Sequence, residues 1–261
     1  MKIPSQSFTK RGFTLIELLV VIAIIGILAA MLLTSIHKAQ ITAQKTMARL
    51  QAGQVVAAIV GYQSSYNVMP VSTASITTAA TATGDFTYGG NFKTPTGMAA
   101  VQSYGTVVDN SEIIAVLLDL ENFGNGNPTI NVGHIKNPNK TSLLPAKMSG
   151  NTSSPGVGLD GVYRDPWGNP YVITIDLNGD GKARDAFYSD PNVSADPSNP
   201  NGGLQGLIKR TLPSGVSVFE WAAPVMVWSA GPDKMIDPNP SNSANGKANK
   251  GVNKDNILSW P

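Results

Sequence analysis

The chain has no cysteine, little charge and only two histidines. Without cysteine, its 261 residues cannot form disulfides, haem–thiolate centres or cysteine-based zinc sites. Charged side chains make up 14% of the chain, whereas glycine and proline number 26 and 18. This composition is more typical of a loop-rich exported protein than of a compact cytosolic enzyme. With disulfides excluded, metal ions bound by carboxylates are one way to hold such loops.

The charge balance does not indicate nucleic-acid binding. The 19 basic and 17 acidic residues give a formal net charge of +2. Three basic residues and no acid precede Phe13, namely Lys2, Lys10 and Arg11. Without them the count is 16 basic against 17 acidic residues. The excess positive charge therefore belongs to the first residues, and no basic surface for a phosphate backbone is expected.

No group of residues in the sequence indicates an enzyme. Neither His37 nor His134 has an acid or nucleophile close to it in sequence, so a surface role is expected for both. Asp160 and Asp165 are candidate acid–base groups, but each is followed by a turn-forming residue. The tryptophans are a candidate sugar-binding platform, with core packing the favoured alternative: Trp167, Trp221, Trp228 and Trp260.

An apolar run at residues 18–33 follows a basic head and an acid, Glu17. With the residues from Phe13 on, the run is long enough to cross a hydrocarbon core of about 30 Å. A secretory signal peptide is the ordinary interpretation, but the run is long and no small-x-small cleavage site clearly ends it. A single-pass anchor is a second alternative. An acid at the edge of such a run predicts either a charged partner or snorkelling to the interface.

Residues 12–22, Gly-Phe-Thr-Leu-Ile-Glu-Leu-Leu-Val-Val-Ile, resemble the class III signal of type IV pilins and type II secretion pseudopilins. The resemblance implies cleavage after Gly12 by a prepilin peptidase and N-methylation of Phe13. It also implies that Glu17 pairs with the amino group of a neighbouring subunit during filament assembly. Pairing would offset the desolvation of both charges. Gly26 and Ala30 form a small-xxx-small pair that permits close helix approach.

The remaining pattern predicts an α+β fold in which a long helix packs on an antiparallel sheet. We expect a leader at 1–12, a transmembrane and assembly helix at 13–33 and its amphipathic continuation at 34–66. A connecting region at 67–160 should hold a loop at 73–83 and a short helix near 110–122, before a β-rich head at 161–261. The continuation carries an apolar stripe, and the head carries β-branched segments. The stripe comprises Ala39, Ala43, Met47, Leu50, Val55, Ile59 and Tyr62, and strands are expected at 171–175, 186–188, 216–221 and 225–228.

Three carboxyl-terminal segments narrow the resemblance to the major, G-type pseudopilin of type II secretion: 165–171, 228–233 and 255–260. In that family calcium holds the last loop against the sheet. The resemblance implies side-chain ligands from Asp233 and Asp255 and a carbonyl ligand from Ala230, with Asp237 a further candidate. Oxygen ligands of this kind suit calcium.

A second cluster is a weaker alternative for calcium: Asp176, Asn178, Asp180 and Asp185. Its opening resembles an EF-hand loop with glycine at the sixth position, but the twelfth position is Phe187. A hairpin turn built on Asn-Gly and Asp-Gly is the favoured interpretation.

The sequence therefore predicts a structural subunit, not an enzyme. We expect an inner-membrane, single-pass precursor with a periplasmic head, which is cleaved, methylated and assembled into a type II secretion pseudopilus. Its partners would be copies of itself, the prepilin peptidase, the inner-membrane secretion platform and minor pseudopilins. The alternatives are a major or minor type IV pilin or adhesin that binds a surface or cargo and, more remotely, a membrane-tethered periplasmic enzyme.

Overall fold

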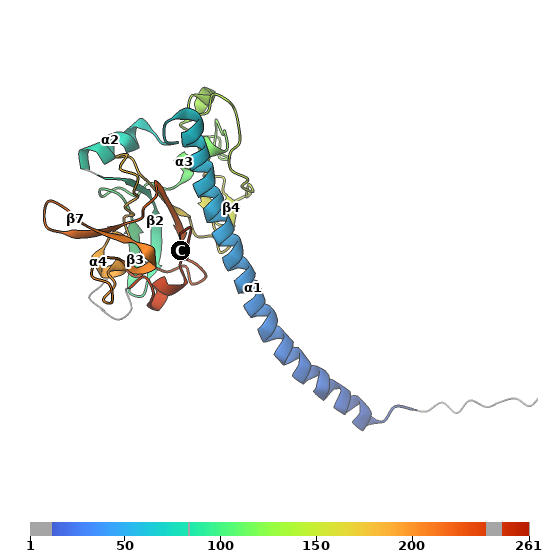
Figure 1. Ribbon diagram of the computed structural model, residues 1–261. Helices are drawn as coiled ribbons and strands as arrows, with labels where there is room; N and C mark the ends of the chain where they lie inside the picture. Colours follow the sequence, from blue (N-terminus) through green and yellow to red (C-terminus); the bar gives the residue numbers. More distant parts are fainter. Residues whose placement is uncertain (1–11, 83, 239–246, 261) are drawn as a thin grey trace, which may run out of the picture. The chain divides into compact units, whose positions relative to one another are not determined.

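Helix α1 (Leu15–Tyr66) runs through both units into which the chain divides, Met1–Ala43 and Gln44–Pro261 (Figure 1). The computed structural model describes residues 12–82, 84–238 and 247–260. The other helices are α2 (Thr73–Ala82), α3 (Ser111–Leu117), α4 (Pro191–Ser194) and the 3-10 turns Val132–His134, Leu204–Gly206 and Gly251–Asp255. The strands are β1 (Phe86–Tyr88), β2 (Gly90–Thr94), β3 (Gly97–Val101), β4 (Gly156–Val157), β5 (Tyr163–Arg164), β6 (Val172–Ile175), β7 (Ile208–Thr211), β8 (Ser217–Glu220), β9 (Val225–Ser229) and β10 (Ile257–Leu258).

The second unit is built on a four-stranded antiparallel sheet of order β1-β6-β9-β10. The pairs β2–β3, β4–β5 and β7–β8 form separate two-stranded sheets. The α+β fold, with a long apolar helix packed against an antiparallel sheet, is confirmed.

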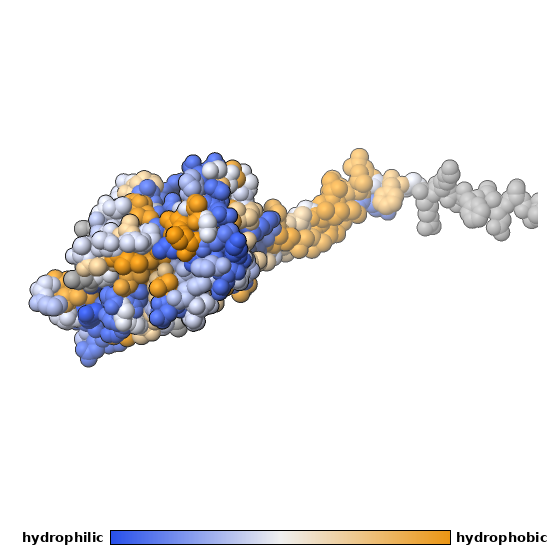
Figure 2. All heavy atoms as spheres, turned by 90° about the horizontal axis from the view of Figure 1, so that it is seen from above, coloured by the Kyte–Doolittle hydropathy of each residue, from blue (hydrophilic) through white to orange (hydrophobic). Residues whose placement is uncertain are grey.

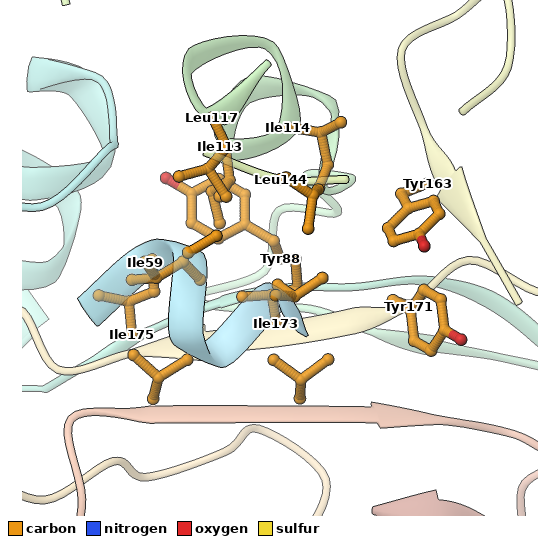
Figure 3. Close-up of a cluster of buried hydrophobic side chains, with 14 of the residues drawn as sticks. Ile59, Tyr88, Ile113, Ile114, Leu117, Leu144, Tyr163, Tyr171, Ile173 and Ile175 are labelled. Atoms are coloured by element: carbon orange, nitrogen blue, oxygen red, sulfur yellow. The ribbon is translucent and has the colours of Figure 1, made fainter. Parts of the chain in front are cut away.

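Both faces of the central sheet are covered. Ile173 and Ile175 on β6 face a core shared with α1 and α3, as Figure 3 shows. The neighbouring positions Val172 and Trp228 face a second core, which includes Phe92 and Leu207. Helix α1 covers only the first of these two faces. A strand that is buried on both faces has mostly apolar residues at consecutive positions. The sequences of β6 and β9 have this pattern.

The face of α1 that packs on the sheet differs in part from the predicted stripe. Val55, Ile59 and Tyr62 are buried as expected. Met47 and Leu50 were predicted to face the head, but they are 50% and 57% exposed. The small side chains of Ala48 and Ala52 are buried in their place, and they allow the helix to approach closely.

The region 67–160, which we expected to connect the helix to the sheet, contributes a strand of its own to the sheet. Its strand β1 pairs with β6 in register Thr87↔Thr174, and their hydroxyls lie 2.9 Å apart. The expected loop at 73–83 is helical over α2 (residue 83 lies outside the described residues), because Ser72 caps it and Ala79 is buried on the core.

Two other elements differ from the prediction. The helix expected near 110–122 is the shorter α3, whose residues Ile113–Leu117 are all buried. The strand expected at 186–188 is a turn, because the carboxylate of Asp185 accepts hydrogen bonds from the backbone N–H groups of Phe187 and Tyr188. An aspartate that binds its own following backbone competes with strand pairing.

Candidate functional site

The first candidate site is the start of α1. Gly12 and Phe13 precede the helix, and Phe13 is 82% exposed. Thr14 and Glu17 form a reciprocal cap: Glu17 N–H donates to Thr14 Oγ1 at 3.3 Å, and Glu17 Oε2 accepts from Thr14 N at 2.8 Å. Thr14 Oγ1 also lies 2.7 Å from Glu17 Oε2. The Thr-x-x-Glu spacing is the signal for such a capping box, and the sequence reasoning overlooked Thr14.

Beyond Glu17 the helix presents apolar side chains to solvent at consecutive positions, and therefore on all sides; Figure 2 shows the face turned to the viewer. Leu19, Ile22 and Leu33 are 54%, 60% and 72% exposed. By length and composition α1 is the one helix within the described residues that could cross a membrane. An apolar helix exposed all round needs lipid or protein to cover it. The basic residues Lys10 and Arg11 lie outside the described residues.

The turn at 165–170 is the second site, and Asp165 is its centre. Asp165 Oδ1 accepts from the backbone N–H groups of Trp167 and Asn169 at 2.9 and 2.8 Å. Its other oxygen accepts from Asn169 Nδ2 at 2.8 Å and from the hydroxyl of Ser229. Burial raises the pKa of this carboxyl group, and the four hydrogen bonds oppose the rise. Asp165 is therefore a structural centre and not an exposed acid or base.

The turn at 165–170 contacts a second segment that resembles the major pseudopilin, residues 228–233. Asn169 Nδ2 also donates to the carbonyl of Gly231 at 2.9 Å, within the segment 228–233. Beyond the turn, the hydroxyl of Tyr171 lies 2.8 Å from Gln51 Oε1 and 3.2 Å from the carbonyl of Ala48, both on α1. One short turn therefore connects α1 to the strand that leads towards Asp233.

Asp233 and Asp255 lie close together, as the predicted calcium site requires. Burial raises the pKa of Asp233, the negative charge of Asp255 adds to the rise, and Lys45 on α1 opposes it. Burial likewise raises the pKa of Asp255, again against Lys45. Asp255 Oδ1 is buried without a hydrogen-bond partner among the described residues. An acid oxygen in that condition is costly unless a cation or proton satisfies it.

The other proposed ligands are placed differently. Ala230 is fully buried and next to Gly231, where a Cβ would lie 2.4 Å from the carbonyl oxygen of Asp255. Only glycine fits at position 231, because any side chain would collide with this carbonyl group. The close approach brings the segments 228–233 and 255–260 together. Asp237 is joined to Asn253 through two hydrogen bonds of its backbone, at 2.8 and 3.0 Å. Within the described residues, no three acidic or histidine side chains gather as a metal site.

The loop at 176–181 forms a turn stabilised by its own carboxylate. Asp176 accepts from the backbone N–H groups of Gly179 and Gly181 at 2.6 and 2.8 Å. Asn178 donates to Asp85 at 3.1 Å, and Asp180 pairs with Arg210 at 3.0 Å.

Asp185 faces the core instead of joining this loop. One oxygen accepts from Thr174 Oγ1 at 2.7 Å and from Trp228 Nε1 at 3.0 Å, while the other holds the backbone turn described above. A carboxylate with four hydrogen bonds inside the protein has little capacity left for a metal ion. The turn interpretation therefore describes this segment better than an EF-hand-like site.

One histidine differs from the expected surface role. His134 Nδ1 lies 2.8 Å from Asp119 Oδ1, and its Nε2 lies 3.2 Å from Glu121 Oε1. The sequence did not indicate this cluster, because the two acids precede the histidine by 15 and 13 residues. The contacts close a loop, and no nucleophile is seen with them among the described contacts. His37 is exposed on α1.

Residues 8–33 match the prokaryotic N-terminal methylation motif. The start of the chain therefore carries a methylation motif. It is also similar to a protein named fimbrial protein EcpC, from Eikenella corrodens, with 42% identity over 77 residues. That match covers 30% of this chain and 50% of the fimbrial protein, so the chain spans about half the length of the relative it matches. No solved structure matches the chain. Both matches support a type IV pilin-like family, and neither distinguishes pilus from pseudopilus subunits.

Proposed function

We propose that this chain is a structural filament subunit that is cleaved after Gly12, methylated at Phe13 and assembled through α1. The observation that carries the proposal is the apolar half of α1, which is exposed all round and lies within the matched methylation motif, residues 8–33. Such a helix is stable in a bilayer or in a bundle of like helices. Assembly would exchange lipid contacts for contacts with other copies. Mass spectrometry of the mature chain should find methylated Phe13 at its amino terminus.

Glu17 would align each incoming subunit by pairing with the amino group of Phe13 in a neighbour. Glu17 is exposed and far along the chain from the head, so Glu17→Ala should abolish filaments without changing the melting temperature of the head. Shearing filaments from cells and blotting the sheared fraction measures assembly. Normal filament yield from Glu17→Ala would contradict the pairing role, and Ser35→Ala is a control on the same exposed stretch.

Within this family we favour the type II secretion pseudopilus, with an inner-membrane precursor whose head lies in the periplasm. Support comes from the connection of the turn at 165–170 with the segment 228–233, because both resemble the major pseudopilin. Partners would be the prepilin peptidase, the secretion platform and minor pseudopilins. Deleting the gene should retain exported proteins in the periplasm. Normal export together with loss of surface filaments would instead favour a pilus.

A major or minor pilin or adhesin is the second candidate. The similarity to a protein named as fimbrial favours it, and so does the region 67–160, which adds α2 and the β2–β3 pair to the head. Copy number in isolated filaments separates an abundant subunit from a scarce one.

Calcium bound at Asp233 and Asp255 is a further proposal. The two carboxylates and the buried Oδ1 of Asp255 suit a cation, although Ca²⁺ needs six to eight oxygens in all and backbone carbonyls or water would complete the set. Bound calcium would supply charge neutralisation to this pair, which Lys45 now supplies in part. Chelation should lower the melting temperature of the wild type and leave Asp255→Asn unaffected. An unchanged wild-type melting temperature would reject the site.

A further inference from the structure

A pocket of about 230 Å³ lies in the head, beside the tight turn that follows β3. Its lining is mostly polar and offers a carboxyl group, a guanidinium group, an amide, hydroxyl groups and a phenol ring. The polar lining includes Asp85, Gln102, Ser103, Tyr104, Arg184 and Ser189. Drug-sized ligands fill mainly apolar clefts of roughly 300–1,000 Å³, so this smaller polar pocket suits a small ligand rich in hydroxyl groups.

Tyr104 has a backbone conformation that tyrosine rarely adopts. Its φ is 53° and that of Gly105 is 78°, in a turn closed by the hydrogen bond from Thr106 N–H to the carbonyl of Ser103 at 3.0 Å. Turns with positive φ at both central residues favour asparagine, aspartate or glycine, and a bulky side chain there costs free energy. The hydroxyl of Tyr104 donates to the carbonyl of Asp85 at 2.9 Å, yet the residue stays 41% exposed. Strain that holds an exposed aromatic ring at a pocket indicates a function for the ring.

Gly84 allows the guanidinium group of Arg184 to lie beside this ring. A Cβ at Gly84 would collide with Arg184 Nη2 and would lie 2.7 Å from Tyr104 Oη. No positive φ makes glycine necessary at this position, so the close approach of the two side chains accounts for it. A cationic group and an aromatic ring are thus held together in the wall of the pocket.

The pocket also has hydrogen-bonding groups that the head does not use. The exposed amide of Gln102 and the half-buried hydroxyl of Ser189 make no side-chain hydrogen bond with the described residues. An amide and a hydroxyl can each donate and accept, whereas Arg184 only donates and an ionised Asp85 only accepts. An ion of either sign would be attracted by one of these two charged groups and repelled by the other. A sugar is uncharged, its hydroxyl groups both donate and accept, and its C–H face can pack on an aromatic ring.

A second pocket, of about 240 Å³, adjoins the first and shares Gln102 and Ala186 with it. Its lining includes Ala100 and Val101 at the end of β3 and Val193 on α4. The two pockets therefore form one groove, and a ligand that fills the first can extend into the second. A chain of sugar units has this extended form.

We propose that this groove in the head binds an uncharged oligosaccharide, with one sugar ring against Tyr104 and its hydroxyl groups bonded to Gln102 and Arg184. The proposal goes beyond the role as a filament subunit and does not depend on it, because the lining lies wholly within the second unit. The tryptophans do not provide such a surface, since Trp228 and Trp260 are buried in the second core.

An array of neutral and acidic oligosaccharides tests the class of ligand. The array is incubated with the full chain in a detergent that has no sugar headgroup, so that the detergent does not compete for the groove. Neutral oligosaccharides should bind, and acidic ones should bind no better than their neutral counterparts. Binding of none of them, or of acidic ones alone, would overturn the proposal.

Calorimetric titration of the full chain with the neutral oligosaccharide that binds best tests the residues. Gln102→Ala should weaken binding by about tenfold, which corresponds to the loss of one good hydrogen bond, and should leave the melting temperature unchanged. Tyr104→Asn removes the ring but suits the positive φ of the turn, and it should weaken binding by about tenfold or more.

Thr106→Ala is the matched control, because Thr106 is exposed in the same turn but does not line either pocket. It should bind the oligosaccharide as the wild type does. Wild-type affinity of Gln102→Ala and Tyr104→Asn would overturn the placement of the ligand. An equal loss of affinity in Thr106→Ala would overturn it too, because the effect would then belong to the turn and not to the lining.

Discussion

Asp85 should make the stability of the head depend on pH between 6 and 8. It lies just before β1, is 5% exposed, and accepts hydrogen bonds from the backbone N–H of Arg184 at 2.7 Å and from Asn178 at 3.1 Å. Burial raises the pKa of Asp85 to about 7, and the negative charges of Asp176 and Asp180 add to the rise. The perturbations are a change of pH and the substitution Asp85→Asn.

The sign follows from proton binding. The pKa of Asp85 in the folded chain lies above its ordinary value of 3.8, so the folded state holds a proton that the unfolded state has released. The bound proton makes its full contribution to the free energy of unfolding below about pH 4. This contribution is lost as the pH rises through about 7. Between pH 6 and pH 8 the loss is about 1.4 kcal/mol, one tenfold change in the unfolding constant. For a head of this size, the melting temperature would fall by about 3–5 °C.

Urea unfolding of the full chain in detergent, followed by tryptophan fluorescence, measures this loss, because Trp228 is buried beside Phe187 and Tyr188. Asp85→Asn should remove most of the difference between pH 6 and pH 8. Asp109→Asn, at an exposed acid, is the control and should retain it. An Asp85→Asn protein with the full wild-type pH dependence would refute the reasoning.

Three substitutions in the head test its connections. Asp165→Ala leaves the hydroxyl of Ser229 and three N–H groups without their acceptor, and it should destabilise the head by about 3–5 kcal/mol in urea titration. Ile173→Ala should cost about 2–5 kcal/mol by the same measurement, because the side chain is fully buried between α1 and the sheet. Tyr62→Phe removes a hydrogen bond to the carbonyl of Lys136 and should cost about 1 kcal/mol, with faster amide exchange near that residue.

Sequence alone could predict those parts of the fold that depend on local pattern. The apolar run, the end of α1 near Tyr66 and the β-branched strands β6 and β9 all follow from periodicity or composition. The turn at 165–170 follows from residue chemistry, because Asp, Pro, Gly and Asn each have a defined preference there. Its hydrogen bond to Gly231 could not be predicted, since the partner is more than 60 residues away.

The errors come from tertiary contacts that override local preference. The segment 73–82 is rich in threonine and alanine and has little helix signal, yet its buried Ala79 and a cap at Ser72 make it helical. That cap is itself held by Glu112, which accepts from the backbone N–H of Ser72 at 2.6 Å and from the hydroxyl of Tyr88 at 2.7 Å. One carboxylate from α3 thus orients α2 and β1 together.

The capping box at the start of α1 changes how the proposed pairing of Glu17 should be understood. In the single subunit its carboxylate is already satisfied by Thr14, through the backbone N–H and the hydroxyl. A partner's ammonium group must therefore compete with two hydrogen bonds from uncharged donors, and it adds an attraction between opposite charges that those donors lack. The advantage is greatest where water is excluded, because a low dielectric strengthens the attraction between opposite charges. The pair should accordingly form only when neighbouring helices already cover the site, so contacts between the apolar helices would precede it in assembly.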